Sequence, residues 1–197
     1  RPTEVDGKRF GDIEMDTIVA KGQKSAILTL VEKSTNLCFI KKIDGGFNPA
    51  AAAKAAILLL LPYKDKLKTI TTDNGFEFRD HETITRVLGI PVFFADPYAS
   101  CQKGAIENTN KLIRQYIPKK SDFSDFNDDR LFEIQTLLNN RPRKKHDYIS
   151  PFKLFAPFFL PVALRPWIYE KHTYLPLTLS LAEESEGDPA ADPAHHK

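Results

Sequence analysis

The chain of 197 residues is 42% hydrophobic, which is enough for one domain of ordinary size with a buried core. Its longest apolar stretch, residues 50–61, is interrupted by Lys54 and closed by Pro62, which excludes a membrane span and indicates a buried helix. With 28 Lys and Arg against 26 Asp and Glu, and two cysteines without metal-binding or redox spacing, the composition is typical of a soluble protein of the reducing cytoplasm.

The first part of the chain predicts three strands followed by a long helix. Apolar residues cluster between turn-prone segments, as expected for an antiparallel meander. Asn48 followed by Pro49 is a typical helix start, with a capping side chain and a proline in the first turn. Cys38 falls in the third strand, where a small buried thiol is expected. The strands are predicted at residues 13–20, 26–32 and 37–43, and the helix ends at about Leu61.

The next part of the chain alternates short strands with helices. Gly89 and Pro118 each mark a helix end. Strands are predicted at residues 68–72 and 90–95, and helices at 80–88, 103–116 and 128–139. The last helix has one apolar face, formed by Leu131, Ile134, Leu137 and Leu138. The complete order of strands and helices is typical of an α/β sandwich.

The C-terminal part is irregular, because eight of the 14 prolines lie at or beyond Pro142. Residues 151–160 are rich in aromatic side chains and are expected to dock on the core. Residues 182–197 hold five acids and one lysine and have little to bury, so this tail is expected to be disordered. The remaining residues 1–181 carry 27 Lys and Arg against 21 Asp and Glu, a modest basic excess that permits nucleic-acid binding.

Three carboxylates stand in distinctive surroundings. Asp16 lies inside an apolar strand, where a charge needs a compensating cation or donors, although its alternation with Glu14 also fits a solvent-facing side chain. Asp73 ends a strand and begins an Asp-Asn-Gly segment, which is either an ordinary turn or a ligand position at the carboxyl end of a sheet strand. Glu107 lies on a predicted helix, and 33 residues separate it from Asp73. Considered alone, Glu107 is most simply a solvent-exposed helix residue.

The helix of Glu107 also carries a polar face. Asn110, Lys111 and Arg114 follow Glu107 at i+3, i+4 and i+7 and therefore share its face. A carboxylate followed by two cations on one face suits a metal ligand beside phosphate contacts. A second basic cluster either follows a DNA backbone or is a plain charged loop, and it includes Arg141, Arg143 and Lys144.

Three carboxylates are a suitable ligand set for Mg²⁺ or Mn²⁺. Hard oxygen ligands suit these cations, and two ions about 3.5–4 Å apart can activate an attacking oxygen and stabilise a leaving one in phosphoryl transfer. We therefore predict two divalent ions in the active complex, held by Asp16, Asp73 and Glu107.

Several segments together resemble the transposases of the bacterial insertion sequence 30 family. They are residues 14–16, 72–75, 95–100, 104–114 and 139–144. The resemblance implies an α/β, RNase H-like fold, with a central mixed five-stranded sheet of three antiparallel strands and then two parallel ones, flanked by helices. It implies a catalytic core at residues 1–160, followed by an irregular extension at 161–181 and the tail at 182–197. The three carboxylates would form the family's D-D-E triad.

The resemblance also implies an activity. A divalent-metal-dependent transposase cuts DNA to expose a 3′-hydroxyl, which then attacks a target phosphodiester. Its partners would be DNA, at the transposon ends and the target, and further copies of itself in a homodimer or larger synaptic complex. It would be cytoplasmic, associated with the nucleoid when bound to DNA, and not with a membrane. A helix-turn-helix region precedes the core in the family, and because this chain begins at Arg1 without a Met, we expect it to start inside a longer protein.

Two alternatives remain open at this point. One is an RNase H-fold nuclease or resolvase that cleaves without joining, although the Asn-Lys pair at residues 110–111 favours transposition. The other is a DNA- or partner-binding module derived from a transposase, which the three intact carboxylates disfavour.

Overall fold

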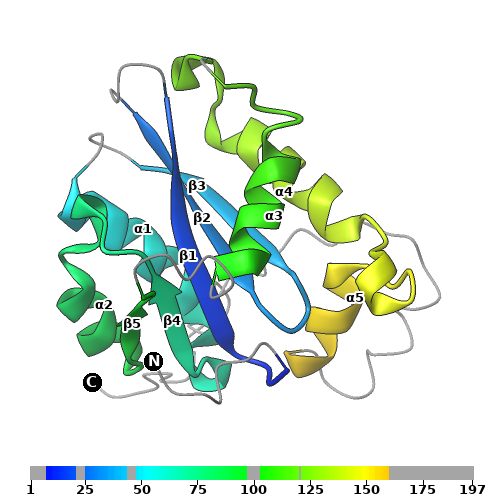
Figure 1. The fold of residues 1–197 in the computed structure, drawn as a ribbon, viewed down its shortest axis with the longest axis horizontal. Coiled ribbons are helices and arrows are strands. Elements are labelled where there is room, and N and C mark those ends of the chain that lie inside the picture. Colours follow the sequence, from blue (N-terminus) through cyan, green and yellow to red (C-terminus); the bar gives the residue numbers. More distant parts are fainter. Residues whose placement is uncertain (1–7, 21–24, 44–47, 97–102, 120, 160–197) are drawn as a thin grey trace, which may run out of the picture.

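The computed structural model describes residues 8–20, 25–43, 48–96, 103–119 and 121–159. Within them lies a five-stranded sheet with the order β3-β2-β1-β4-β5 (Figure 1). β1 pairs antiparallel with β2, and β2 antiparallel with β3, whereas β4 runs parallel to β1 and β5 parallel to β4. The predicted mixed sheet is confirmed. Its strands are β1 (Asp12–Val19), β2 (Ala26–Glu32), β3 (Cys38–Lys42), β4 (Thr69–Thr72) and β5 (Val92–Phe94).

Helices cover both faces of this sheet. α1 (Pro49–Leu60) and α2 (His81–Leu88) pack on one face, and α3 (Gly104–Ile113) and α4 (Asp128–Asn140) on the other (Figure 1). Alternate residues of a strand point to opposite faces, so the chain forms two separate apolar cores. No helix within the described ranges is long and apolar enough to cross a membrane.

Short sequence signals determine where α1 begins and where α2 ends. The side chain of Asn48 accepts a hydrogen bond from the backbone N–H of Ala51 at 2.8 Å, and Pro49 occupies the first turn. A 3₁₀ segment, η2 (Leu61–Lys66), follows α1 directly. Gly89 ends α2 with φ of 71°, a left-handed conformation that strains residues with a side chain.

The predicted apolar face of α4 needs one correction. Leu131, Ile134 and Leu138 are buried, but Leu137 is 38% exposed. The buried face is completed instead by Gln135 and Asn139, whose polar side chains bond the backbone of β3. The spacing of apolar residues identified the helix but not which side of it is buried, because the polar residues Gln135 and Asn139 occupy part of the buried face.

The C-terminal described segment docks as predicted. α5 (Pro151–Phe155) and η7 (Ala156–Phe158) place aromatic rings against the core. Phe155 packs edge to face with Tyr63 at a centroid distance of 5.3 Å, and Phe158 stacks on Phe10 at 3.7 Å. Residues 160–197, which hold the predicted extension and tail, lie outside the described residues.

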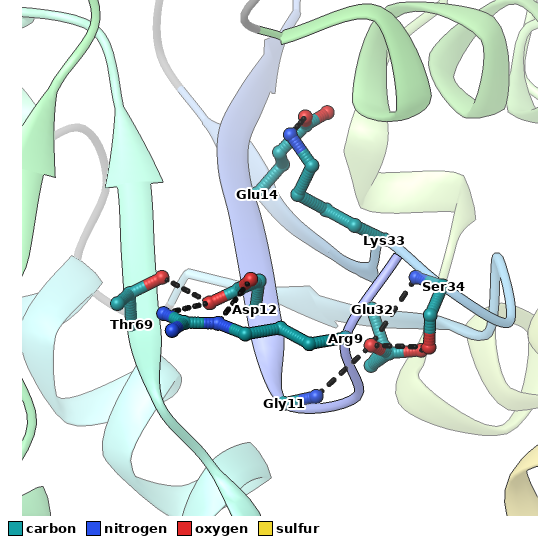
Figure 2. A network of polar contacts seen from close by, with 8 residues as sticks. All are labelled: Arg9, Gly11, Asp12, Glu14, Glu32, Lys33, Ser34 and Thr69. Atoms are coloured by element: carbon teal, nitrogen blue, oxygen red, sulfur yellow. Dashed lines mark hydrogen bonds and ion pairs between the residues drawn. The ribbon is translucent and has the colours of Figure 1, made fainter. Parts of the chain in front are cut away.

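A buried polar network holds the beginning of β1 (Figure 2). The guanidinium of Arg9 binds the carboxylate of Asp12 at 2.8 and 3.0 Å, and Thr69 of β4 donates to the same carboxylate at 2.7 Å. Glu32 accepts from the backbone N–H of Gly11 at 3.1 Å. Buried carboxylates are tolerated only with such donors, so the network fixes β1 between its two neighbours.

Candidate active site

Asp16 and Asp73 meet just beyond the parallel pairing of β1 with β4: Asp16 lies inside β1, and Asp73 follows the last residue of β4. The pairing of β1 with β4 sets Asp12 beside Thr69 and Glu14 beside Thr71, and two further residues bring Asp16 level with Asp73. The ammonium of Lys103 joins the two carboxylates: its Nζ lies 3.3 Å from Asp16 Oδ1 and 3.0 Å from Asp73 Oδ2. Residues far apart in sequence therefore converge on one cation.

The turn after β4 fixes the carboxylate of Asp73. Its Oδ1 accepts from the backbone N–H of Gly75 at 3.2 Å, and this leaves Oδ2 to Lys103. A Cβ at Gly75 would lie 2.5 Å from Glu77 Oε2, so any other residue there would displace the Glu77 carboxylate. Glu77 in turn accepts from the hydroxyl of Thr17 in β1 at 2.8 Å. The Asp-Asn-Gly segment is thus a tight turn tied back to β1.

Helix α3 brings Asn110 into contact with Asp16 and places Glu107 in the neighbouring hollow. The side-chain amide of Asn110 donates to Asp16 Oδ2 at 2.8 Å, while its own Oδ1 is buried with no hydrogen-bond partner among the described residues. Glu107 is exposed and lines, together with Asp16, a hollow of about 440 Å³. The hollow is lined by Asp16, Thr17, Ile18, Glu107, Asn110, Lys111, Arg114 and Lys119.

The three predicted carboxylates are not equally close. Lys103 bridges Asp16 and Asp73, whereas Glu107 shares the neighbouring hollow with Asp16. Within the part of the chain that the structure describes, no three Asp, Glu, His or Cys side chains gather as a metal-binding group. The structure thus brings together two of the three carboxylates and holds the third on the wall of the adjoining hollow.

A buried ion pair positions the start of α3. Glu14 Oε2 accepts from the backbone N–H of Ile106 at 2.8 Å, and its Oε1 pairs with Lys33 Nζ at 2.8 Å. Figure 2 shows Glu14 and Lys33 reaching each other beside β1. Glu14 does not face solvent, because α3 covers that face and leaves the side chain 1% exposed, so the alternation of Asp16 with Glu14 does not indicate a solvent-facing side of β1. Glu14 therefore anchors the residue immediately before Glu107.

The charges at the site influence one another. Burial raises the pKa of the Asp16 carboxyl above its ordinary value, Lys103 acts against this shift and the charge of Asp73 adds to it. Burial by itself would lower the pKa of Lys103, but the two aspartates outweigh it and the net pKa is raised. Lys103 is therefore a charged group held in place by two carboxylates.

This donor set suits a divalent cation. Two carboxylates already converge on one positive charge, and both present the hard oxygen ligands that Mg²⁺ and Mn²⁺ prefer. The orphaned Oδ1 of Asn110 is a further buried oxygen beside them. Asp16 and Asp73 therefore fit a metal ion in place of the ammonium, and Glu107 lies on the wall of the hollow that Asp16 also lines.

The predicted basic residues on α3 differ in their surroundings. Lys111 is exposed on the wall of the hollow. Arg114 donates to the backbone carbonyls of Val19 and Pro118, each at 3.3 Å, and burial lowers its pKa. Lys111 is thus the more available of the two cations.

The second predicted basic cluster borders another hollow of about 340 Å³, next to the start of α3. Arg143 donates to the carbonyl of Leu138 at 3.0 Å and lines this hollow with Lys144, while Arg141 is exposed at the end of α4. The cluster therefore lies beside the N-terminal end of α3, whereas Lys111 lies farther along that helix.

Two residues of the site were not assigned by sequence reasoning. Lys103 stands four residues before Glu107, about one helical turn, and Glu14 stands two residues before Asp16, on the same face of the strand. These spacings are the only signals in the nearby sequence, and neither identifies the side chain that Lys103 or Glu14 binds.

The chain is similar to several curated transposases, although no family model matches it. It is 46% identical over 156 residues to the transposase for insertion sequence element IS4351 of Bacteroides fragilis, covering 79% of this chain and 48% of the relative. It is 34% identical to the IS1086 transposase of Cupriavidus metallidurans, covering 79% and 46%, and 35% identical to transposase InsI of IS30A from Escherichia coli, covering 77% and 39%. The chain thus spans less than half the length of these relatives.

Two solved structures share the fold. The catalytic core domain of BIV integrase matches with a TM-score of 0.58 at 18% identity, covering 75% of this chain and 94% of that one. A chain of the simian T-cell lymphotropic virus intasome in complex with PP2A regulatory subunit B56 gamma also gives 0.58, at 17% identity, covering 78% and 57%. The fold is therefore RNase H-like, as the sequence resemblance implied.

Proposed function

Because the chain is a homologue of the transposases of the insertion sequence 30 family, we propose that it is the catalytic domain of an insertion-sequence transposase, with its core in residues 1–160. The activity, substrates and partners of the whole protein are part of this proposal. The observation that carries it is the convergence on one cation of Asp16, inside β1, and Asp73, at the carboxyl end of the parallel strand β4.

In this proposal Asp16, Asp73 and Glu107 hold two Mg²⁺ or Mn²⁺ ions. When bound, such ions polarise the scissile phosphate, activate the attacking oxygen and stabilise the leaving one. Asn110 keeps Asp16 in one orientation through its amide donor, and Glu14 sets the start of the helix that carries Glu107. In this proposal the strands and the tethered helix position the acidic side chains.

DNA would lie across the face that carries α3. Lys111 is exposed beside Glu107 and suits a phosphate contact near the scissile bond. The other proposed DNA contacts are Asn110, Arg114, Arg141, Arg143 and Lys144. A synaptic complex of two or more copies would bring paired transposon ends together in the cytoplasm, at the nucleoid.

A joining assay tests the proposal. The chain, supplied with Mn²⁺, is incubated with supercoiled plasmid and a fluorescent duplex that carries a free 3′-hydroxyl. We expect plasmid nicking and covalent transfer of the label, both abolished by EDTA and by Asp16→Asn, but not by Asp65→Asn, which alters an exposed aspartate in η2. Nicking without label transfer would favour the nuclease alternative. Full activity of a folded Asp16→Asn variant would refute the site assignment.

A further inference from the structure

Lys103 occupies a position that the proposed chemistry does not use. It precedes α3, and its side chain is 10% exposed. The only groups that its ammonium is seen to bind, among the described residues, are the carboxylates of Asp16 and Asp73. The positive charge therefore lies between the two proposed metal ligands.

We propose that Lys103 substitutes for a metal ion in the metal-free chain and must be displaced when a divalent cation binds Asp16 and Asp73. The inference rests on the proposed function, since it takes these two aspartates as ligands. It adds a specific role for Lys103: the ammonium keeps the carboxylates converged and competes with the metal for their oxygens.

The energetics support competition. Two carboxylates that approach one cation would repel each other without it, and burial adds to the cost of the Asp16 charge. Lysine suits a displaceable role because its charge is compact, strongly hydrated and carried on a flexible stem. Asp73 is 51% exposed in its side chain, so the bridge opens toward solvent. A metal must break both contacts before it gains the same oxygens.

The direct test is Mn²⁺ affinity without DNA, measured by the electron paramagnetic resonance signal of free Mn²⁺ during titration. Lys103→Met removes the competing charge, and we expect it to tighten binding by about tenfold or more. The matched control is Lys54→Met, which removes an exposed lysine from α1, on the opposite face of the sheet, and should change affinity by less than about threefold. Lys103→Arg keeps a charge and should not tighten binding.

Thermal unfolding gives a second readout. Without metal, Lys103→Met should melt below wild type, because the carboxylates lose their counter-charge. Added Mn²⁺ should then raise the melting temperature of this variant by more than it raises that of wild type. If Lys103→Met does not fold without metal, Lys103→Gln is a second variant, because its side chain is polar and uncharged. It should also bind Mn²⁺ more tightly than wild type.

The outcomes separate this inference from the proposed function. If Asp73→Asn abolishes Mn²⁺ binding but neither Lys103→Met nor Lys103→Gln binds more tightly than Lys54→Met, the role of Lys103 is overturned and the metal ligands stand. If Asp16→Asn and Asp73→Asn both bind Mn²⁺ like wild type, the ligand assignment fails and the inference fails with it. If removing Lys103 tightens Mn²⁺ binding, and adding Asp73→Asn to that variant abolishes the gain, the result supports both the ligand assignment and the role of Lys103.

Discussion

The side-chain amide of Asn139 pairs with the backbone of Cys38 in the same way as a neighbouring strand would. Its Oδ1 accepts from the Cys38 N–H at 2.9 Å and its Nδ2 donates to the Cys38 carbonyl at 2.8 Å. One turn earlier in α4, Gln135 Oε1 accepts from the N–H of Ile40 at 2.8 Å. β3 is an edge strand, so these two side chains occupy backbone groups that would otherwise be open to another chain.

Asn139→Ala should destabilise the fold. Both backbone groups of Cys38 would lose their partner in a buried setting, which we expect to cost about 1–3 kcal/mol in the free energy of unfolding. Urea unfolding measures this difference. The control is Asn140→Ala, an exposed neighbour whose amide, among the described residues, bonds the Thr136 carbonyl within the same helix. Equal stability of the two variants would contradict the edge-pairing role.

The thiol of Cys38 should be inert in the native chain and should make stability depend on alkaline pH. Burial raises its pKa from 9.0 to about 12. In a Cys101→Ser background we expect no reaction with a disulfide reagent at pH 8 until urea unfolds the chain. Because the unfolded thiol ionises first, stability should fall as pH rises from about 9 to 12, by at most about 1.4 kcal/mol per pH unit from this group.

The control for this pH dependence is Cys38→Ala in the same Cys101→Ser background. Tyrosines and lysines titrate in both proteins, so only the difference between their slopes reports Cys38. Identical slopes, or rapid labelling of the native thiol, would contradict the buried environment.

Local structure could be predicted from sequence where the signal is itself local. Asn48 with Pro49 located the start of α1, and Gly89 the end of α2, because caps depend on neighbours within one turn. Lys103 could not be assigned, since its partner Asp16 lies 87 residues away. The burial of Glu14 depended likewise on α3, whose Ile106 is 92 residues along the chain.

The buried ion pair of Glu14 with Lys33 gives a prediction for the stability of the fold. Glu14→Gln leaves the buried ammonium of Lys33 without its counter-charge, and we expect a loss of about 3–5 kcal/mol in stability. Lys33→Met added to Glu14→Gln should recover part of that loss, because no unpaired buried charge remains. Urea unfolding of the wild type, both single variants and the double variant measures the coupling. Strictly additive losses would show that the pair is not coupled.

Lys111 should contribute to DNA affinity through a phosphate. It is exposed beside Glu107, and no ion pair joins these two described residues, so its ammonium is available to a backbone passing the hollow. Lys111→Ala should weaken binding of a duplex and reduce the slope of log affinity against log salt by about one. Lys54→Ala removes another exposed lysine, from α1 on the opposite face of the sheet, and should leave the slope unchanged. Fluorescence anisotropy at several salt concentrations compares the three proteins, and equal slopes for both variants would reject the phosphate contact.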